Sequence, residues 1–140
     1  MSIRGLLLLA GWISLMGASP LDGSKPTPAP RPNILEKLRP GQWDLRQRGE
    51  SMPQRVCIKA GMELIQLRHP GRMCERIVLE QADSSILVQY TCRGSGFGRT
   101  RIRRETSQLV QIETQGVADG FPFDFSAEGR WAGECQQSTG

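Results

Sequence analysis

The chain has 140 residues, a formal net charge of +4 at pH 7, one histidine and four cysteines. A single histidine excludes a metal site built on three histidines, and the absence of a Cys-x-x-Cys motif excludes a thioredoxin-like redox couple. No Gly-x-Ser-x-Gly motif marks an exposed serine nucleophile in the sequence. We therefore expect a protein that is not an enzyme and that holds no metal and no cofactor.

Residues 1–18 have the layout of an export signal. Arg4 supplies the positive charge, about a dozen largely apolar residues follow it, and the small residues Gly17 and Ala18 come next. A membrane-spanning helix needs roughly twenty apolar residues, so we expect no stable membrane span after cleavage. The expected location is periplasmic or secreted. An uncleaved anchor is the alternative, because Met16 is bulky for the third position before a cut after Ala18.

Residues 19–32 are rich in proline and contain almost nothing apolar between the prolines. This composition favours an extended spacer that connects the leader to a folded part, with a proline-recognition ligand as the alternative. The folded domain is expected over residues 33–135, followed by a flexible tail over residues 136–140. At its start, Asn33 is expected to cap a short turn that ends before Pro40. About a hundred residues are enough for one domain with one modest core.

From Trp43 onward, apolar and polar residues alternate along about seven short stretches, with the period of two that is typical of half-buried strands. Turn signals such as Asp83-Ser84 and Asp119-Gly120 separate these stretches. The sequence therefore predicts a mainly β fold, a single antiparallel meander of about seven strands that is curled into a half-barrel or a sandwich. The alternating positions are Trp43 and Leu45; Val56 and Ile58; Ile77 and Leu79; Ile86, Val88 and Tyr90; Thr100 and Ile102; Val110 and Ile112; Phe121, Phe123, Phe125 and Trp131.

One segment departs from this period. Ala60, Leu64 and Leu67 recur at helical spacing and Pro70 follows them, so we expect one short helix over residues 60–68 that packs on the sheet. The inward-facing strand residues should form one core. We assign to it Trp43, Ile77, Leu79, Val88, Tyr90, Ile102, Ile112, Phe123, Phe125 and Trp131.

The four cysteines are expected to form two structural disulfides, because an exported chain meets an oxidising compartment. They lie too far apart in the sequence for a zinc motif. With a tight turn at Asp83-Ser84, cross-strand partners place Cys92 on the core face and Cys74 on the other face. The last strand puts Cys135 on the core face as well. This parity predicts the pairs Cys57 with Cys74 and Cys92 with Cys135.

His69 lies in the sequence Arg68-His-Pro-Gly-Arg72, directly after the expected helix. We expect it in a surface turn, and a general base is the alternative. The glycine-rich run 94–98 resembles a phosphate-binding loop, but it joins two expected strands and no helix follows it. It therefore predicts a hairpin turn.

Arginines are concentrated between residues 93 and 104, where no acidic residue interrupts them. The odd-numbered ones would project from one face of a strand and form a basic stripe. Such a stripe favours an anionic partner, for example lipopolysaccharide phosphates or an acidic glycan, whereas nucleic acid is not expected because export removes the usual target. The alternative is that Glu113 and nearby acids pair with the stripe across strands. The candidate anion-binding residues are Arg93, Arg99, Arg101 and Arg103.

One resemblance covers about Pro40 to Cys135. It rests on the segments Pro40-Gly-Gln-Trp-Asp-Leu45, Arg55-Val-Cys-Ile58, Leu64-Ile-Gln-Leu-Arg-His-Pro-Gly71, Cys74, Tyr90-Thr-Cys92, Gly94-Ser-Gly-Phe-Gly-Arg-Thr100, Gln115-Gly-Val-Ala-Asp-Gly120 and Gly133-Glu-Cys135. In this order the segments resemble domain-of-unknown-function family 3617, and its sphingomonad-type members in particular. That resemblance implies a small exported bacterial protein with a β-rich domain and no assigned activity, and it provides no catalytic residues to carry over to this sequence.

Two hypotheses for the function follow. The first is a non-enzymatic module that binds an anionic or amphipathic envelope component. The second is a protein-interaction module, such as an inhibitor of a secreted hydrolase. Inhibitors of basic wall-degrading enzymes would be expected to be acidic, whereas this chain is basic, so the first hypothesis is favoured.

Overall fold

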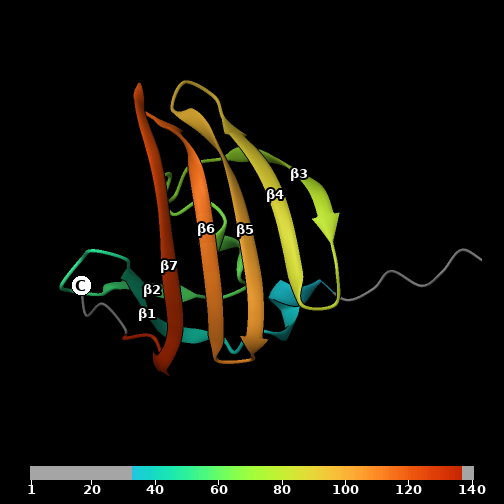
Figure 1. The fold of residues 1–140 in the computed structure, drawn as a ribbon, viewed down its shortest axis with the longest axis vertical. Coiled ribbons are helices and arrows are strands. Elements are labelled where there is room, and N and C mark those ends of the chain that lie inside the picture. The colour runs from blue at the N-terminus through green and yellow to red at the C-terminus, as the bar shows by residue number, and fades with distance from the viewer. Residues whose placement is uncertain (1–32, 137–140) are drawn as a thin grey trace, which may run out of the picture. The chain divides into compact units, whose positions relative to one another are not determined.

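The structure is a computed structural model that describes residues 33–136, so the predicted signal, the linker and residues 137–140 of the tail lie outside it. Seven antiparallel strands form one sheet, as Figure 1 shows, and this confirms the predicted fold class. The elements are a 3-10 turn η1 (Ile34–Lys37), β1 (Gly41–Gln47), β2 (Gln54–Ile58), a 3-10 turn η2 (Met62–Leu64), β3 (Cys74–Gln81), β4 (Ser85–Cys92), β5 (Gly96–Thr106), β6 (Leu109–Ala118) and β7 (Phe121–Gly133). Asn33 caps η1 as predicted, because its side chain accepts a hydrogen bond from the Leu35 N–H at 3.1 Å.

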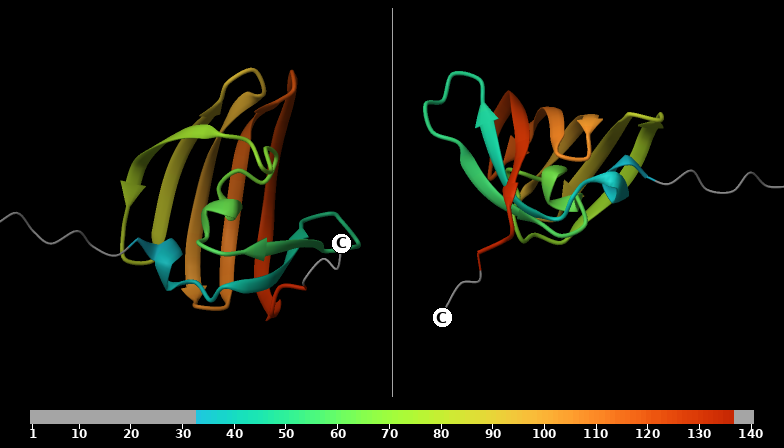
Figure 2. Two further views of the ribbon diagram at one scale, coloured as in Figure 1. Left: turned by 180° about the vertical axis from the view of Figure 1, so that it is seen from behind. Right: turned by 90° about the horizontal axis from the view of Figure 1, so that it is seen from below.

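The strand order is β2-β1-β7-β6-β5-β4-β3. Strands β3 to β7 follow one another as a meander, and β1 then pairs with β7, so the two edges of the sheet are β2 and β3. Residues 59–73 connect these edges and cross one face of the sheet, as the view from behind in Figure 2 shows. We call the face that this segment covers the inner face and the opposite one the outer face. The fold is thus a single open, curled sheet and not a sandwich.

The core lies between the inner face and the segment 59–73. Alternate side chains of β4, β5 and β6 point into it, since successive residues of a strand face opposite sides of the sheet. Five predicted core residues are confirmed as buried, namely Trp43, Val88, Tyr90, Ile102 and Ile112. Phe123 is half-buried, and Phe125 and Trp131 pack against the core from half-buried positions.

The prediction that Ile77 and Leu79 belong to the core is wrong. Their side chains are 62% and 43% exposed. The register near the turn is the predicted one, with Gln81 opposite Ile86, but a β-bulge between Val78 and Glu80 shifts it. Beyond the bulge Val78 lies opposite Val88, and Ile77 therefore points to the outer face.

The same bulge overturns the predicted disulfides. Cys74 lies directly opposite Cys92 and bonds to it, and Cys57 bonds to Cys135. The second bond depends on the pairing of β1 with β7, which brings the end of β7 within one strand of β2. The structure has two disulfides, as predicted, but both predicted pairs of cysteines are wrong.

The expected helix over residues 60–68 is reduced to the single 3-10 turn η2. Gly61 enters this turn in a left-handed conformation, with φ of 78°, which a right-handed helix that begins at residue 60 cannot contain. The segment is nevertheless fixed on the sheet. Leu64 and Ile65 are buried, and the Thr100 hydroxyl donates a hydrogen bond of 2.6 Å to the Ile65 carbonyl.

Candidate functional site

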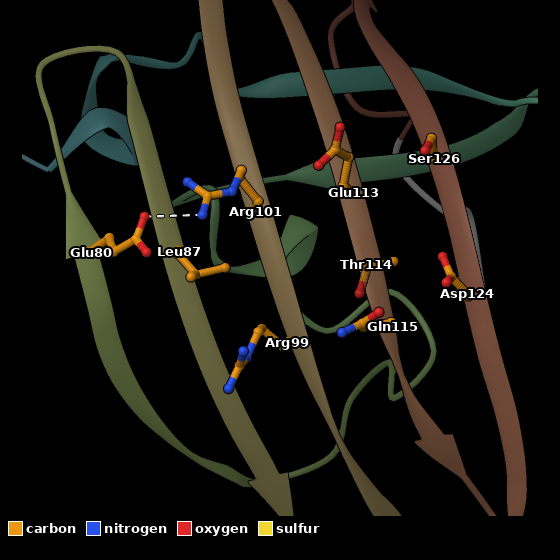
Figure 3. A pocket seen from close by; sticks show the side chains of 9 residues that line it. All are labelled: Glu80, Leu87, Arg99, Arg101, Glu113, Thr114, Gln115, Asp124 and Ser126. Carbon is orange, nitrogen blue, oxygen red and sulfur yellow. Dashed lines mark hydrogen bonds and ion pairs between the residues drawn. The ribbon is translucent and has the colours of Figure 1, made fainter.

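The outer face carries the predicted arginine stripe. Arg99, Arg101 and Arg103 alternate along β5 with the buried Thr100 and Ile102, so their side chains leave the sheet on the same side. Figure 3 shows Arg101 and Arg99 one below the other along β5 on this face. Arg93, the fourth candidate, is exposed in the turn between β4 and β5 and does not belong to the row.

Two of the three arginines already have carboxylate partners. Arg101 pairs with Glu80 of β3 at 2.9 Å, and Arg103 pairs with Glu105 of its own strand at 3.1 Å. Glu113 lies opposite Arg101 in the register, yet it is not the acid that pairs with the stripe. The neutralising acids therefore differ from the predicted one.

Arg99 is the exception in this row. Its guanidinium donates one hydrogen bond of 3.2 Å to the Gln89 side chain, and among the described residues it forms no ion pair. A guanidinium has five N–H donors, so most of those of Arg99 remain available. Among the three arginines of the row, Arg99 is thus the one whose guanidinium is most available to an external anion.

A polar hollow of about 390 Å³ lies between the strands on the outer face, and Figure 3 shows the residues that line it. Its charged side chains are two arginines, Arg99 and Arg101, and three carboxylates, those of Glu80, Glu113 and Asp124. This lining is mixed in sign and not a uniformly basic surface. Further along β7 the charges are paired as well, because a 2.6 Å hydrogen bond from Arg130 lowers the pKa of Glu128.

An apolar hollow of about 460 Å³ adjoins the polar one and shares Arg99, Gln115 and Asp124 with it. Phe97 of β5 and Val117 of β6, which lie opposite each other in the register, line it together with Phe123 of β7. Phe97 is 52% exposed there. The sequence analysis did not identify this hollow, although the odd-numbered position of Phe97 puts it on the same face as the arginines.

The prediction that His69 lies in a surface turn is wrong, because its side chain is only 2% exposed. Nε2 donates a hydrogen bond of 3.0 Å to the Ser95 carbonyl, which can only accept. Nδ1 of the neutral ring then accepts from the Tyr90 hydroxyl at 3.2 Å. Both ring nitrogens are occupied in the core, so His69 holds the 59–73 segment to the β4–β5 turn and does not face a substrate.

Tyr90 is the partner of His69 and the only tyrosine of the chain. Burial raises its pKa to about 12. The unfolded chain would release this proton near pH 10, about two units earlier. Because the folded protein keeps this proton to a higher pH than the unfolded chain does, the free energy of unfolding is unaffected by Tyr90 below about pH 10. Between about pH 10 and pH 12 it falls by about 1.4 kcal/mol per pH unit.

Ultraviolet titration of tyrosinate absorbance in the folded protein should accordingly give a midpoint near 12. Unfolding experiments at a series of alkaline pH values should show the corresponding loss, and Tyr90→Phe, which cannot ionise, should remove this part of it. A tyrosinate midpoint near 10 in folded protein would show that the hydroxyl is open to solvent.

The remaining motifs have structural roles. The glycine-rich run 94–98 forms the turn between β4 and β5 and the start of β5, as predicted. Packing also explains why residue 98 is a glycine, since a Cβ atom at this position would clash with the Tyr90 hydroxyl oxygen. Within residues 33–136, no group of histidine, cysteine and carboxylate side chains has the arrangement of a metal site.

The disulfides bear on the compartment in which the protein works. Both disulfides indicate a non-reducing environment, such as that met by exported proteins. In the part of the chain that the structure describes, no helix has the length and apolar character needed to cross a membrane.

Comparison with known proteins gives one match. Neither the curated proteins nor the solved structures contain a match to this chain. A family model described as "Protein of unknown function (DUF3617)" matches residues 38–135, which span β1 to β7 and all four cysteines. The chain therefore belongs to the DUF3617 family of proteins of unknown function.

Proposed function

We propose that the domain is a non-enzymatic binding module for an amphipathic anionic component of the bacterial envelope. The anionic group of the ligand contacts Arg99, and its apolar part occupies the apolar hollow beside Phe97. The observation that carries this proposal is the position of Arg99, the stripe arginine without a carboxylate partner, on the border of the polar and apolar hollows.

Arg99 is favoured over its two neighbours for an electrostatic reason. An anion that approaches Arg101 or Arg103 must compete with Glu80 or Glu105, each already within 3.1 Å of its arginine. Exposed ion pairs of this kind contribute at most about 1 kcal/mol to stability, but their carboxylates still repel a second anion. Arg99 donates instead to the neutral Gln89 amide, so an anion can approach its guanidinium without displacing a bound carboxylate.

The apolar hollow supports an amphipathic ligand over a simple inorganic anion. Phe97 and Val117 are opposite each other in the register. They lie two residues along their strands from the pair of Arg99 and Gln115, on the same face. A ligand that contacts Arg99 can therefore cover the exposed Phe97 ring as well, and the burial of apolar surface is favourable by about 25 cal/mol per Å². An exported domain meets such molecules in the phosphate-bearing and carboxylate-bearing lipids and glycolipids of the envelope.

Substitution of Arg99 by glutamine should weaken the binding of dodecyl phosphate about tenfold, the equivalent of roughly 1.4 kcal/mol. Arg103→Gln is the matched control, because it removes the same charge from the same strand face at a position that already has a partner. It should change the affinity by less than about twofold. Calorimetric titrations below the micelle concentration, at low and at moderate ionic strength, measure both effects.

Phe97→Ser tests the apolar half of the site and should weaken dodecyl phosphate and the uncharged dodecyl maltoside alike. Arg99→Gln should leave dodecyl maltoside unaffected. Equal affinity of the original protein and Arg99→Gln for dodecyl phosphate would rule out the anionic subsite. A loss of the same size in Arg103→Gln would show that only the overall charge of the face matters.

A further inference from the structure

A cleft of about 330 Å³ lies between β2, the segment 59–73 and β3, where the two edges of the curled sheet are bridged. It shares no residue with either hollow of the outer face. We call it the seam cleft and define it by the residues that the argument uses, which are Val56, Met62, Glu63, Gln66, Leu67 and Arg76.

Apolar side chains form much of the seam cleft. Val56 of the edge strand β2 and Met62 of η2 are half-buried and pack against the core, and Leu67 is 8% exposed. Because these three side chains already rest on a fixed core, the cleft is a preformed apolar surface. It can receive an apolar side chain of a ligand without rearrangement of the fold.

Arg76 brings a positive charge to this apolar surface. Its guanidinium donates a hydrogen bond to the side-chain oxygen of Gln66, and it forms no ion pair within residues 33–136. Gln66 is itself buried, and its amide nitrogen donates to the carbonyls of His69 and Arg72, at 2.9 Å each. A fully hydrogen-bonded glutamine thus orients Arg76, whose remaining N–H groups can donate hydrogen bonds to a carboxylate.

Glu63 presents the complementary group. Its Oε1 accepts a hydrogen bond of 3.0 Å from the Lys59 backbone N–H, whereas Oε2 is buried and finds no hydrogen-bond partner among the described residues. A buried acceptor without a partner is unfavourable, because it has lost its water without a replacement. Because the Glu63 side chain lines the cleft, rotation about its last bond would turn this oxygen towards the N–H of a ligand, so that the cleft takes an N–H donor as well as a carboxylate.

We propose that the seam cleft binds the carboxyl-terminal end of a peptide whose last residues are apolar. The terminal carboxylate pairs with Arg76, a backbone N–H of the peptide donates to Glu63 Oε2, and an apolar side chain packs on Val56, Met62 and Leu67. A fatty acid fits less well, because it has no donor for Glu63. This site is separate from the proposed outer-face site, so either can fail without the other.

The test uses the acetylated peptide Ala-Leu-Leu with a free carboxyl terminus and the same peptide with a terminal carboxamide. Binding is followed by nuclear magnetic resonance of the full folded chain, with the Gln66 side-chain amide as a reporter inside the cleft. We expect the free-carboxyl peptide to shift this amide and the Met62 methyl signal, and the carboxamide to bind at least about tenfold more weakly.

Arg76→Gln should reduce the affinity for the free-carboxyl peptide to that for the carboxamide. Arg55→Gln is the matched control. Arg55 lies next to Val56 on the edge strand β2, but its guanidinium pairs with Asp44 at 3.7 Å, away from the cleft. Glu63→Gln keeps the shape but weakens the acceptor, so it should weaken the carboxamide peptide; the free-carboxyl peptide should lose less, because the substitution also removes a negative charge from the cleft. An unchanged backbone spectrum in each variant verifies that the fold persists.

Equal binding of the two peptides, or equal losses in Arg76→Gln and Arg55→Gln, would overturn the proposal. So would saturable binding of decanoate at these signals with no response to either peptide, which would identify an apolar carboxylate as the ligand. None of these results depends on Arg99 or Phe97. The outer-face site is tested separately by the binding of dodecyl phosphate.

Discussion

Replacement of Trp43 by alanine is expected to lower the free energy of unfolding by about 3–5 kcal/mol, the range for removal of a large aromatic side chain from a packed core. Trp43 is fully buried, with 0% exposure, between β2 and β7 in the sheet. Its ring also fixes the chain before β1, since Nε1 donates a hydrogen bond of 2.9 Å to the Arg39 carbonyl. The substitution therefore removes packing and leaves a carbonyl without its partner.

Trp131 is the matched control for this experiment. It lies opposite Trp43 in the register and is only half-buried, with its Nε1 donating to the Pro40 carbonyl and the Arg39 guanidinium 3.7 Å above its ring. Trp131→Ala should cost clearly less than Trp43→Ala. Urea unfolding followed by far-ultraviolet circular dichroism measures both. A loss for Trp131→Ala that equals or exceeds that for Trp43→Ala would contradict this assignment of the core.

The alternation of apolar residues was sufficient to predict the strands and the inner face of β4, β5 and β6. In these central strands every second side chain is covered, so burial follows parity directly, as Val88, Tyr90 and Ile102 illustrate. The same parity predicts the outward direction of Arg99, Arg101 and Arg103. Local periodicity succeeds here because β5 is paired with β4 and with β6 without interruption between these residues.

Parity failed where the register is interrupted. The bulge at Leu79 adds one residue to β3, and from that point every side chain faces opposite to the prediction, including Cys74 and Ile77. Neither glycine nor proline marks the bulge in the sequence, so local turn chemistry gives no signal for it. His69 was misplaced for a different reason. Its burial depends on Tyr90 and Ser95, which are distant in the sequence, and not on its own turn.

The candidate sites were predictable only in part. The row of arginines follows from one strand, but its partner Glu80 lies on β3, on the far side of β4, so this pair depends on the registers of two separate strand pairings. The apolar hollow combines residues from four strands, and the seam cleft combines residues from three separate segments. Such concave surfaces depend on the curl of the sheet and on the path of residues 59–73, neither of which leaves a local pattern.

Removal of the disulfide between Cys57 and Cys135, by substitution of both cysteines with alanine, is expected to lower the free energy of unfolding by about 4–5 kcal/mol. The bond closes a loop with a sequence separation of 78 residues, and the corresponding value for Cys74 and Cys92 is 18. In the loop-entropy model the shorter loop gives about 3 kcal/mol, because a shorter closed loop restricts the unfolded chain less.

The order of the two losses is the decisive result, because both double variants lose the same number of sulfur atoms. The Cys74 and Cys92 variant should retain more stability, yet it frees the edge strand β3, which carries Arg76 and Glu80. We therefore expect it to disturb the seam cleft and the Arg101 ion pair more than the other variant does. Denaturant unfolding at matched pH gives the two free energies, and peptide mapping of unreduced protein should yield a peptide that links Cys74 to Cys92. A larger loss for the short loop would contradict the expected dependence on loop length, and a peptide that links Cys57 to Cys74 would refute both the connectivity and the bulged register of β3.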